Sequence, residues 1–269
     1  MPADRTLEAT HAYYERGEER ERLAAGIGEL EFERTKEIVL RHLPPAPAVV
    51  VDIGGGPGRY TLWLAGLGYR VLHRDLMPLH VRQLRAAAAA ESGINSAVAD
   101  ARELDLDDQC ADAALLLGPL YHLDRRPDRL RALAEARRVV RRGGPVFAAA
   151  ITRWAPRLNG ILRQRLYQRL PHIEAEIPAL ERTGRIPPVH PGAFCGYAHR
   201  PGQLRSELTA GGFRVVDLVS VEGPASMLDD LAARMSDPRD RQVVVETARA
   251  MERVPELLGV GPHLLATAR

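Results

Sequence analysis

An acidic residue and a run of glycines lie close together in the segment VDIGGGPG, residues 51–58. Asp52 precedes Gly54 by two residues, and Gly56 and Gly58 follow at the same spacing. A strand, a glycine turn and a helix N-terminus place backbone N–H groups against a ligand, and glycine allows that ligand to approach closely. The spacing fits neither the phosphate loop that ends in Gly-Lys-Ser/Thr nor the G-x-G-x-x-G dinucleotide loop. The segment therefore predicts a ligand site in which an acid takes part and a phosphate is disfavoured.

Two further acids stand at the ends of the next expected strands. Asp75 ends a strand expected over 69–75, and Asp100 ends a weaker one expected over 94–100. The carboxyl edge of a parallel sheet is where ligands bind, so both side chains are expected near the glycine loop. A carboxylate there can accept two hydroxyl groups through strong, charge-assisted hydrogen bonds. The alternative for both acids is a turn or helix-cap residue with no ligand.

These residues resemble the cofactor motifs of the class I S-adenosylmethionine-dependent methyltransferases, in particular the branch that acts on small molecules. ADAALLLGPLYHL (111–123) is similar to the fourth-strand motif of that family. LAEARRVVRRGGPVFAA (133–149) is similar to its helix, glycine turn and fifth strand. The resemblance extends over about residues 45–155. It departs at Arg74, where the family usually has an apolar residue.

The resemblance implies S-adenosyl-L-methionine as the cofactor, S-adenosyl-L-homocysteine as the product, and no metal. It implies that Asp75 accepts hydrogen bonds from the ribose hydroxyls, and that Asp100 and the backbone after it meet the adenine. Asp52 is placed to position water or the ammonium group of the ligand. The full set expected at the cofactor is Tyr14, Asp52, Gly54, Gly55, Gly56, Gly58, Asp75, Leu76, Asp100, Ala101 and Gly118.

Three side chains are candidates for action on a methyl acceptor. Tyr121 and His122 follow the fourth expected strand and are expected to border the methyl group. His122 is a candidate general base, which is needed only if the acceptor must lose a proton; the alternative is a packed histidine that shapes the loop. His199 is a candidate acceptor-binding residue, or else a surface or capping residue. Tyr14 can cover the sulfonium by a cation–π contact, or pack as part of an ordinary amphipathic helix.

Strands and helices alternate five times between residues 48 and 152, which indicates a parallel sheet with helices on both faces. The fold class expected is α/β: a doubly wound, mostly parallel, seven-stranded, Rossmann-like sheet. We expect an N-terminal helical lid (1–44), a cofactor-binding core (45–152 and 201–269) and a helical cap inserted after the fifth strand (153–200). The strands are expected at 48–53, 69–75, 94–100, 111–118, 145–152, 213–223 and 263–269, the last as an antiparallel edge or hairpin partner.

The composition, with 45% hydrophobic and 27% charged residues over 269 positions, is that of a soluble globular enzyme. No apolar run approaches the roughly 20 residues that span a bilayer, the start lacks a signal-peptide pattern, and the two cysteines do not suggest a disulfide scaffold. Arg163, Arg165 and Arg169 are interleaved with apolar residues, as on a solvated helix face. We therefore expect a cytoplasmic monomer or homodimer without a nucleic-acid or membrane partner.

The sequence predicts methyl transfer from S-adenosylmethionine to a small-molecule acceptor by in-line displacement. One alternative is methylation of RNA or protein, disfavoured because GPLY (118–121) stands where Asn-Pro-Pro-[Tyr/Phe] would follow the fourth strand. A second is a regulatory protein that binds the cofactor without catalysis. A third is a nicotinamide dehydrogenase of the same architecture.

Overall fold

The computed structural model describes residues 3–89, 93–170, 172–188, 190 and 192–269. The strands are β1 (Val49–Ile53), β2 (Arg70–Asp75), β3 (Ile94–Val98), β4 (Ala113–Leu116), β5 (Val146–Thr152), β6 (Arg185–Ile186), β7 (Gly196–His199), β8 (Val215–Ser220) and β9 (His263–Ala268). The α-helices are α1 (Ala3–Tyr14), α2 (Gly26–Leu40), α3 (Arg59–Gly66), α4 (Pro78–Ala87), α5 (Pro119–His122), α6 (Arg126–Val139), α7 (Ile173–Thr183), α8 (Pro201–Ala210), α9 (Leu231–Ser236) and α10 (Pro238–Met251). Short 3-10 or π helices are η1 (Glu18–Glu21), η2 (Pro156–Arg163), η3 (Leu166–Gln168), η4 (Gly223–Met227) and η5 (Pro255–Leu257).

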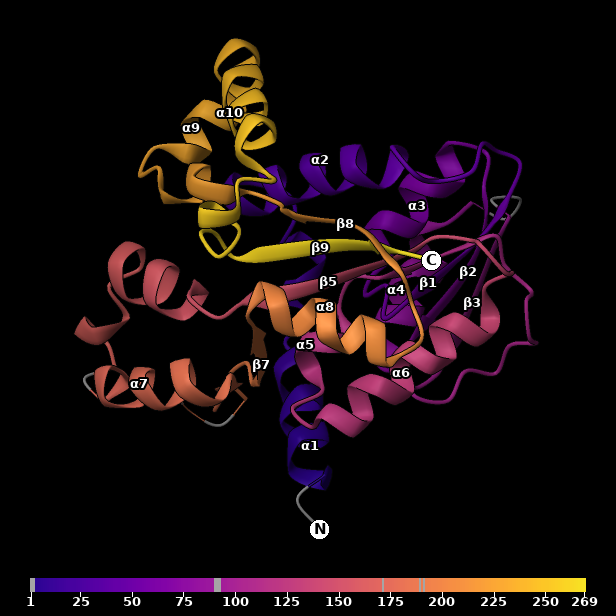
Figure 1. Ribbon diagram of the computed structural model, residues 1–269, viewed down its shortest axis with the longest axis horizontal. Coiled ribbons are helices and arrows are strands. Elements are labelled where there is room, and N and C mark those ends of the chain that lie inside the picture. The colour runs from indigo at the N-terminus through magenta and orange to yellow at the C-terminus, as the bar shows by residue number, and fades with distance from the viewer. Residues whose placement is uncertain (1–2, 90–92, 171, 189, 191) are drawn as a thin grey trace.

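The main sheet runs in the order β3-β2-β1-β4-β5-β9-β8 (Figure 1). Its neighbours are parallel except β9, which is antiparallel to both β5 and β8. The short strands β7 and β6 extend from the end of β5, where Thr152 pairs with His199. This confirms the predicted fold class, a mostly parallel, doubly wound sheet.

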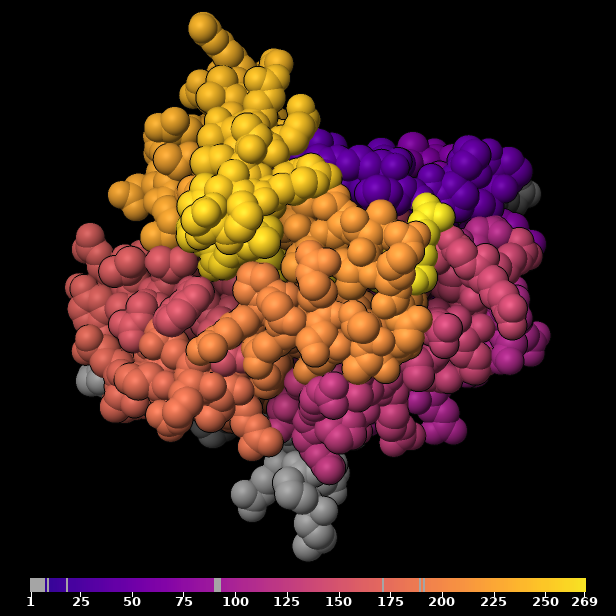
Figure 2. Space-filling view, in the orientation of Figure 1, coloured from indigo at the N-terminus to yellow at the C-terminus, as the bar shows by residue number. Residues whose placement is uncertain are grey.

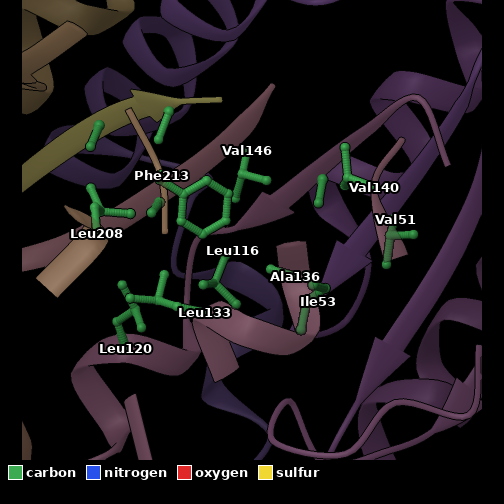
Figure 3. Packing of buried hydrophobic residues seen from close by; sticks show 14 of the residues in the cluster. Val51, Ile53, Leu116, Leu120, Leu133, Ala136, Val140, Val146, Leu208 and Phe213 are labelled. Atoms are coloured by element: carbon green, nitrogen blue, oxygen red, sulfur yellow. The ribbon is translucent and has the colours of Figure 1, made fainter. Parts of the chain in front are cut away.

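Alternation along the strands divides the core into two layers. Val51 and Ile53 point to one face, where they pack in a cluster with Leu133 of α6 and with Phe213 (Figure 3). Val50 points to the other face, in a cluster with residues of α2 and α3. Because both faces of the strands are covered by helices, the strand sequences are almost continuously apolar. The sheet therefore holds the loops at its carboxyl edge in fixed positions.

The N-terminal segment is not one continuous helical run. Gly17 and Gly26 have φ angles of 74° and 58°, in the left-handed region that glycine adopts easily. They separate α1, η1 and α2, so that α1 lies below the sheet and α2 above it in the view of Figure 1. No described helix combines the length and apolar character needed to cross a membrane.

The last strand differs from its prediction. β9 lies between β5 and β8, and β8 forms the edge of the sheet. Residues 264–268 are almost entirely buried, and their apolar side chains on both faces suit an interior strand. Arg74, which departs from the apolar residue usual at this position, is buried in β2. Its guanidinium is paired with Asp105 at 2.5 Å and with the Asn95 side chain at 2.9 Å.

Candidate functional site

The glycine loop follows β1 directly and ends where α3 begins. Gly54 and Gly56 have φ angles of 67° and 58°, which other residues adopt at a cost. A Cβ atom on Gly54 would lie 2.6 Å from the Cγ atom of Pro119, so the loop also fits closely against the segment after β4. The loop therefore needs glycine for its backbone shape and for its packing.

A cavity with about 1340 Å³ of empty space, part of it open to solvent, lies at the carboxyl edge of the sheet. The N-terminal segment and the loops after β1, β2, β3 and β4 line it. Of the residues expected at the cofactor or acceptor, those that line it are Tyr14, Asp52, Gly54, Gly55, Gly56, Asp75, Leu76, Asp100, Ala101, Gly118, Tyr121 and His122.

Asp75 is 5% exposed and accepts three hydrogen bonds from within the protein. Oδ2 accepts from the Gly56 N–H at 2.8 Å, while Oδ1 accepts from the Met77 N–H at 2.8 Å and pairs with His80 Nδ1 at 2.9 Å. Burial alone would raise its pKa, but the hydrogen bonds from His80, Met77 and Gly56 hold the pKa of Asp75 below its usual range. A carboxylate has about four acceptor positions, so the geometry leaves room for one ligand hydroxyl where two were expected.

Asp52 and Asp100 have different surroundings. Asp52 is 1% exposed and accepts a 2.6 Å hydrogen bond from the Thr61 hydroxyl, and burial raises the pKa of its carboxyl. Asp100 is paired with Arg102 through Nη2 at 2.6 Å and Nε at 3.0 and 3.1 Å. Burial opposes ionisation of Asp100, but the hydrogen bonds from Arg102 lower its pKa. Arg102 therefore occupies this carboxylate, and the neighbouring Ala101 also lines the cavity.

Tyr14 and His122 close one wall of the cavity. The Tyr14 hydroxyl lies 2.6 Å from His122 Nε2, while His122 Nδ1 is buried without a partner among the described residues. Burial lowers the pKa of His122 to about 4 and raises the pKa of the Tyr14 hydroxyl well above its ordinary value. The imidazole is therefore uncharged and the tyrosine protonated at neutral pH. Two neutral tautomers fit this state: either the Tyr14 hydroxyl donates to Nε2 and Nδ1 carries the proton, or Nε2 donates to the Tyr14 oxygen and Nδ1 is an acceptor.

Aromatic rings surround this pair. His122 contacts Tyr121 and Phe194 at centroid distances of 4.9 and 5.3 Å, and Tyr14 contacts His80 at 4.9 Å. His80, which the sequence analysis missed, lines the cavity and has a buried Nε2 without a partner in the described part of the chain. Its sequence signal was its position five residues after Asp75, on the first turns of a helix that starts at the strand end. A wall of ring faces and edges suits a cation or a flat apolar group.

A network of charged residues that no sequence pattern indicated lies beside this wall. Arg22 binds Glu19 at 2.7 Å and Glu31 at 2.6 and 3.2 Å. His263 binds Glu222 at 2.6 Å and lies 3.7 Å from Glu31. Ligand atoms of Glu31, Glu222 and His263 lie within 4.8 Å of one another, as in a metal site. Arg22 and a protonated His263 already balance the two inner carboxylates, so the cluster is compensated by its own side chains.

Two predicted site residues lie elsewhere. Gly58 is buried against Leu84 of α4 and does not line the cavity, so its glycine serves helix packing. The fully buried His199 pairs through Nε2 with Glu207 at 3.2 Å, and it too is absent from the cavity wall. The expectation that His199 meets the acceptor is therefore wrong, because α8 supplies a carboxylate that holds the ring inside the protein.

The cavity fits a nucleoside that carries an amino-acid tail. Asp75 has an acceptor position free for a hydroxyl, and the positive-φ glycines allow close approach to the backbone. Asp52 adds a buried carboxyl next to the loop, and the ring wall of Tyr14, Tyr121 and His122 faces the same space. Of the four arginines that line it, Arg22 is paired with Glu19 and Glu31, and Arg102 is paired with Asp100.

Known proteins match part of this sequence. Residues 51–148 match the family model described as a methyltransferase domain. The ubiquinone/menaquinone biosynthesis C-methyltransferase of Acidiphilium cryptum is 34% identical over 151 residues, a match that covers 53% of this chain. The chain covers 58% of that relative, less than two thirds of its length.

Solved structures share the fold. One similar structure is described as a complex between the Haloferax volcanii Trm112 methyltransferase activator and the putative methyltransferase. The matching chain aligns with 96% of this chain and 96% of its own, with a TM-score of 0.61 and 18% identity. An S-adenosylmethionine-dependent methyltransferase of Methanosarcina mazei aligns with 86% of this chain and 95% of its own, with a TM-score of 0.58 and 18% identity. Residues 51–148 are therefore a methyltransferase domain, and their fold and motifs are those of the class I S-adenosylmethionine-dependent methyltransferases, whose cofactor is S-adenosylmethionine.

Proposed function

We propose that this protein transfers a methyl group from S-adenosylmethionine to a small-molecule acceptor. The observation that carries the proposal is the single cavity that joins the Asp75 edge of the glycine loop to the ring wall around His122. When bound, the cofactor supplies a methyl group activated by the positive charge on its sulfur. The protein then has to orient the acceptor and exclude water, and positioning of this kind contributes about 7–11 kcal/mol in favourable cases.

The cofactor side of the cavity is assigned to the strand ends. Asp75 accepts one ribose hydroxyl with its remaining lone pair on Oδ2, and the backbone of Gly54 and Gly56 lies against the ligand. Asp52 attracts the ammonium group, directly or through a water held with Thr61. Leu76 and Ala101 lie on either side of the nucleoside. Each assignment uses a group that lines the cavity and is still able to contact a ligand.

The acceptor side is assigned to Tyr14, Tyr121 and His122. With Nε2 held by Tyr14, His122 donates from Nδ1 to an oxygen of the acceptor. Removal of a proton by His122 uses the ring nitrogen that carries no proton: Nδ1 while Nε2 donates to the Tyr14 oxygen, or Nε2 once the Tyr14 hydroxyl has left it. An acceptor that is already nucleophilic needs only the first arrangement. The relative from Acidiphilium cryptum is named as a C-methyltransferase of quinone biosynthesis, so hydroxylated aromatic rings are the first acceptors to test.

Calorimetry and label transfer test the proposal together. We expect micromolar binding of S-adenosylhomocysteine and no binding of NADH, and the reverse would identify a dehydrogenase. Methyl-labelled cofactor is then incubated with a panel of small aromatic acceptors, total RNA and protein extract. Label in a small acceptor supports the proposal. Label in RNA or protein alone refutes it, and binding without transfer to any class supports the regulatory alternative.

A further inference from the structure

The segment after β5 presents an unusual surface. Between Arg153 and Leu170 the sequence RWAPRLNGILRQRLYQRL contains no acidic residue. Three of its large apolar side chains are exposed: Leu162 at 60%, Trp154 at 43% and Tyr167 at 37%. Single exposed apolar residues are common, but three in so short a stretch make this segment a candidate for contact with another phase or partner.

Three arginines of the same stretch have no counter-charge. The side chains of Arg163, Arg165 and Arg169 make no hydrogen bond or ion pair with the described residues, and the last two are exposed. Their neighbours behave differently: Arg153 is buried and bound to the Ala198 carbonyl at 2.8 Å, and Arg157 is paired with Glu181. The outer arginines therefore add three uncompensated positive charges. We call the following set the basic apolar surface: Trp154, Leu162, Arg163, Arg165, Tyr167 and Arg169.

The mixture of basic and apolar side chains favours a lipid bilayer over RNA as the partner. An RNA would use the arginines and stack on Trp154 and Tyr167, but it would leave Leu162, the most exposed of the three, in water. A lipid bilayer with anionic headgroups uses both kinds of side chain. Tryptophan and tyrosine prefer the headgroup level, leucine enters the acyl boundary, and arginines are attracted to lipid phosphates. We propose that the basic apolar surface binds the face of an anionic lipid membrane.

The position of this surface in the fold determines which edge of the sheet lies beside the membrane. η2 starts four residues after the end of β5, at the carboxyl edge that also carries the cavity. In Figure 2 the segment forms, with α7, the left flank of the molecule, below the C-terminal helices and on the side opposite β3. A membrane on this flank lies beside the carboxyl edge rather than the opposite edge. The inference departs from the expectation of a solvated helix face without a membrane partner, and it does not depend on the proposed function.

Vesicle binding tests the proposal in the full chain. The probes are vesicles of phosphatidylcholine alone and of phosphatidylcholine with phosphatidylglycerol. We expect co-sedimentation with the anionic vesicles only, weakened by high salt. Each arginine near such a surface contributes about 1 kcal/mol, so the double variant Arg163→Gln/Arg169→Gln should bind about 30-fold more weakly. The matched control Arg205→Gln/Arg239→Gln removes two exposed arginines of α8 and α10 and should bind as the wild type does.

The apolar contact is tested by tryptophan fluorescence. The chain has two tryptophans, Trp63 and Trp154, so brominated lipids should quench the wild type and leave Trp154→Phe almost unquenched. Leu162→Asp should abolish binding, while Val243→Asp, at a site 53% exposed on α10, should not. Circular dichroism and melting temperature check that each variant is folded. Absence of vesicle binding, equal loss in the control variants, or binding of RNA with no binding of vesicles overturns the proposal.

Discussion

The replacement Asp75→Ala tests the cofactor assignment at the residue with the most defined geometry. Three of the roughly four acceptor positions of this carboxylate are taken by Gly56, Met77 and His80. One position is left for a ribose hydroxyl, and one hydrogen bond to a charged acceptor contributes about 1.5–3 kcal/mol. We therefore expect S-adenosylhomocysteine to bind the variant about 10- to 150-fold more weakly than the wild type.

The same replacement also removes three bonds that shape the loop, so affinity alone does not isolate the ligand contact. A cycle that combines Asp75→Ala with cofactor analogues lacking the 2′- or the 3′-hydroxyl separates the two effects. The wild type should bind one of these analogues about 10- to 150-fold more weakly than the intact compound. The variant should bind the intact compound and that analogue equally.

Titration calorimetry measures all the affinities, and urea unfolding shows that the variant is folded at the temperature used. If the wild type binds both deoxy analogues as tightly as the intact compound, the ribose assignment is refuted. It is also refuted if Asp75→Ala keeps the discrimination, because the hydroxyl would then be recognised by another group.

Other consequences concern the ring wall, the charged network and the loop. His122→Ala should lower turnover about 10²- to 10⁴-fold with little change in cofactor affinity, and His122→Asn, which keeps an N–H near the place of Nδ1, should retain more activity; a mild effect of alanine would assign the ring to packing. Burial lowers the pKa of His263, but its two neighbouring carboxylates raise it to about 9, so its stabilisation is complete below about pH 6.5 and is lost as the pH rises through 9. In urea unfolding, the stability of the wild type relative to His263→Gln should fall by about 2–3 kcal/mol over that range, and parallel curves would contradict the ion pair. A Cβ on Gly55 would lie 2.5 Å from Asp52 Oδ2, so Gly55→Ala should cost about 1–3 kcal/mol and weaken cofactor binding, whereas Gly66→Ala, with nothing within 4 Å, should be neutral or slightly stabilising in thermal unfolding.

Much of the fold could be predicted because its signals are local. The run VVVDI is apolar and β-branched, as a strand covered on both faces requires, and the glycines after it mark the turn. The acids Asp75 and Asp100 stand at strand ends, and strand ends meet at one edge. The cavity gathers both, although their roles toward the cofactor stay predictions.

The rest depends on contacts between distant segments. Nothing near His263 in the sequence indicates that Glu222 and Glu31 will surround it, since α2, β8 and β9 meet only in the folded sheet. His199 was misassigned for the same reason: the aromatic residues around it suggested a binding segment, while its partner Glu207 lies on the next helix. The position of β9 also follows from the sheet as a whole rather than from its six residues.

The interior position of β9 has a consequence for the order in which the protein folds. β5 pairs with β9 from Val146↔Ala268 to Ile151↔His263, across about 120 positions of the chain. Among the described strands, β8 pairs with β9 alone, so it joins the sheet only through β9. During synthesis, the facing edges of β5 and β8 therefore stay open until residues 263–268 have emerged, and β9 then pairs between them. Pairings of such sequence separation form slowly, and the waiting edges are the part of this chain most exposed to aggregation.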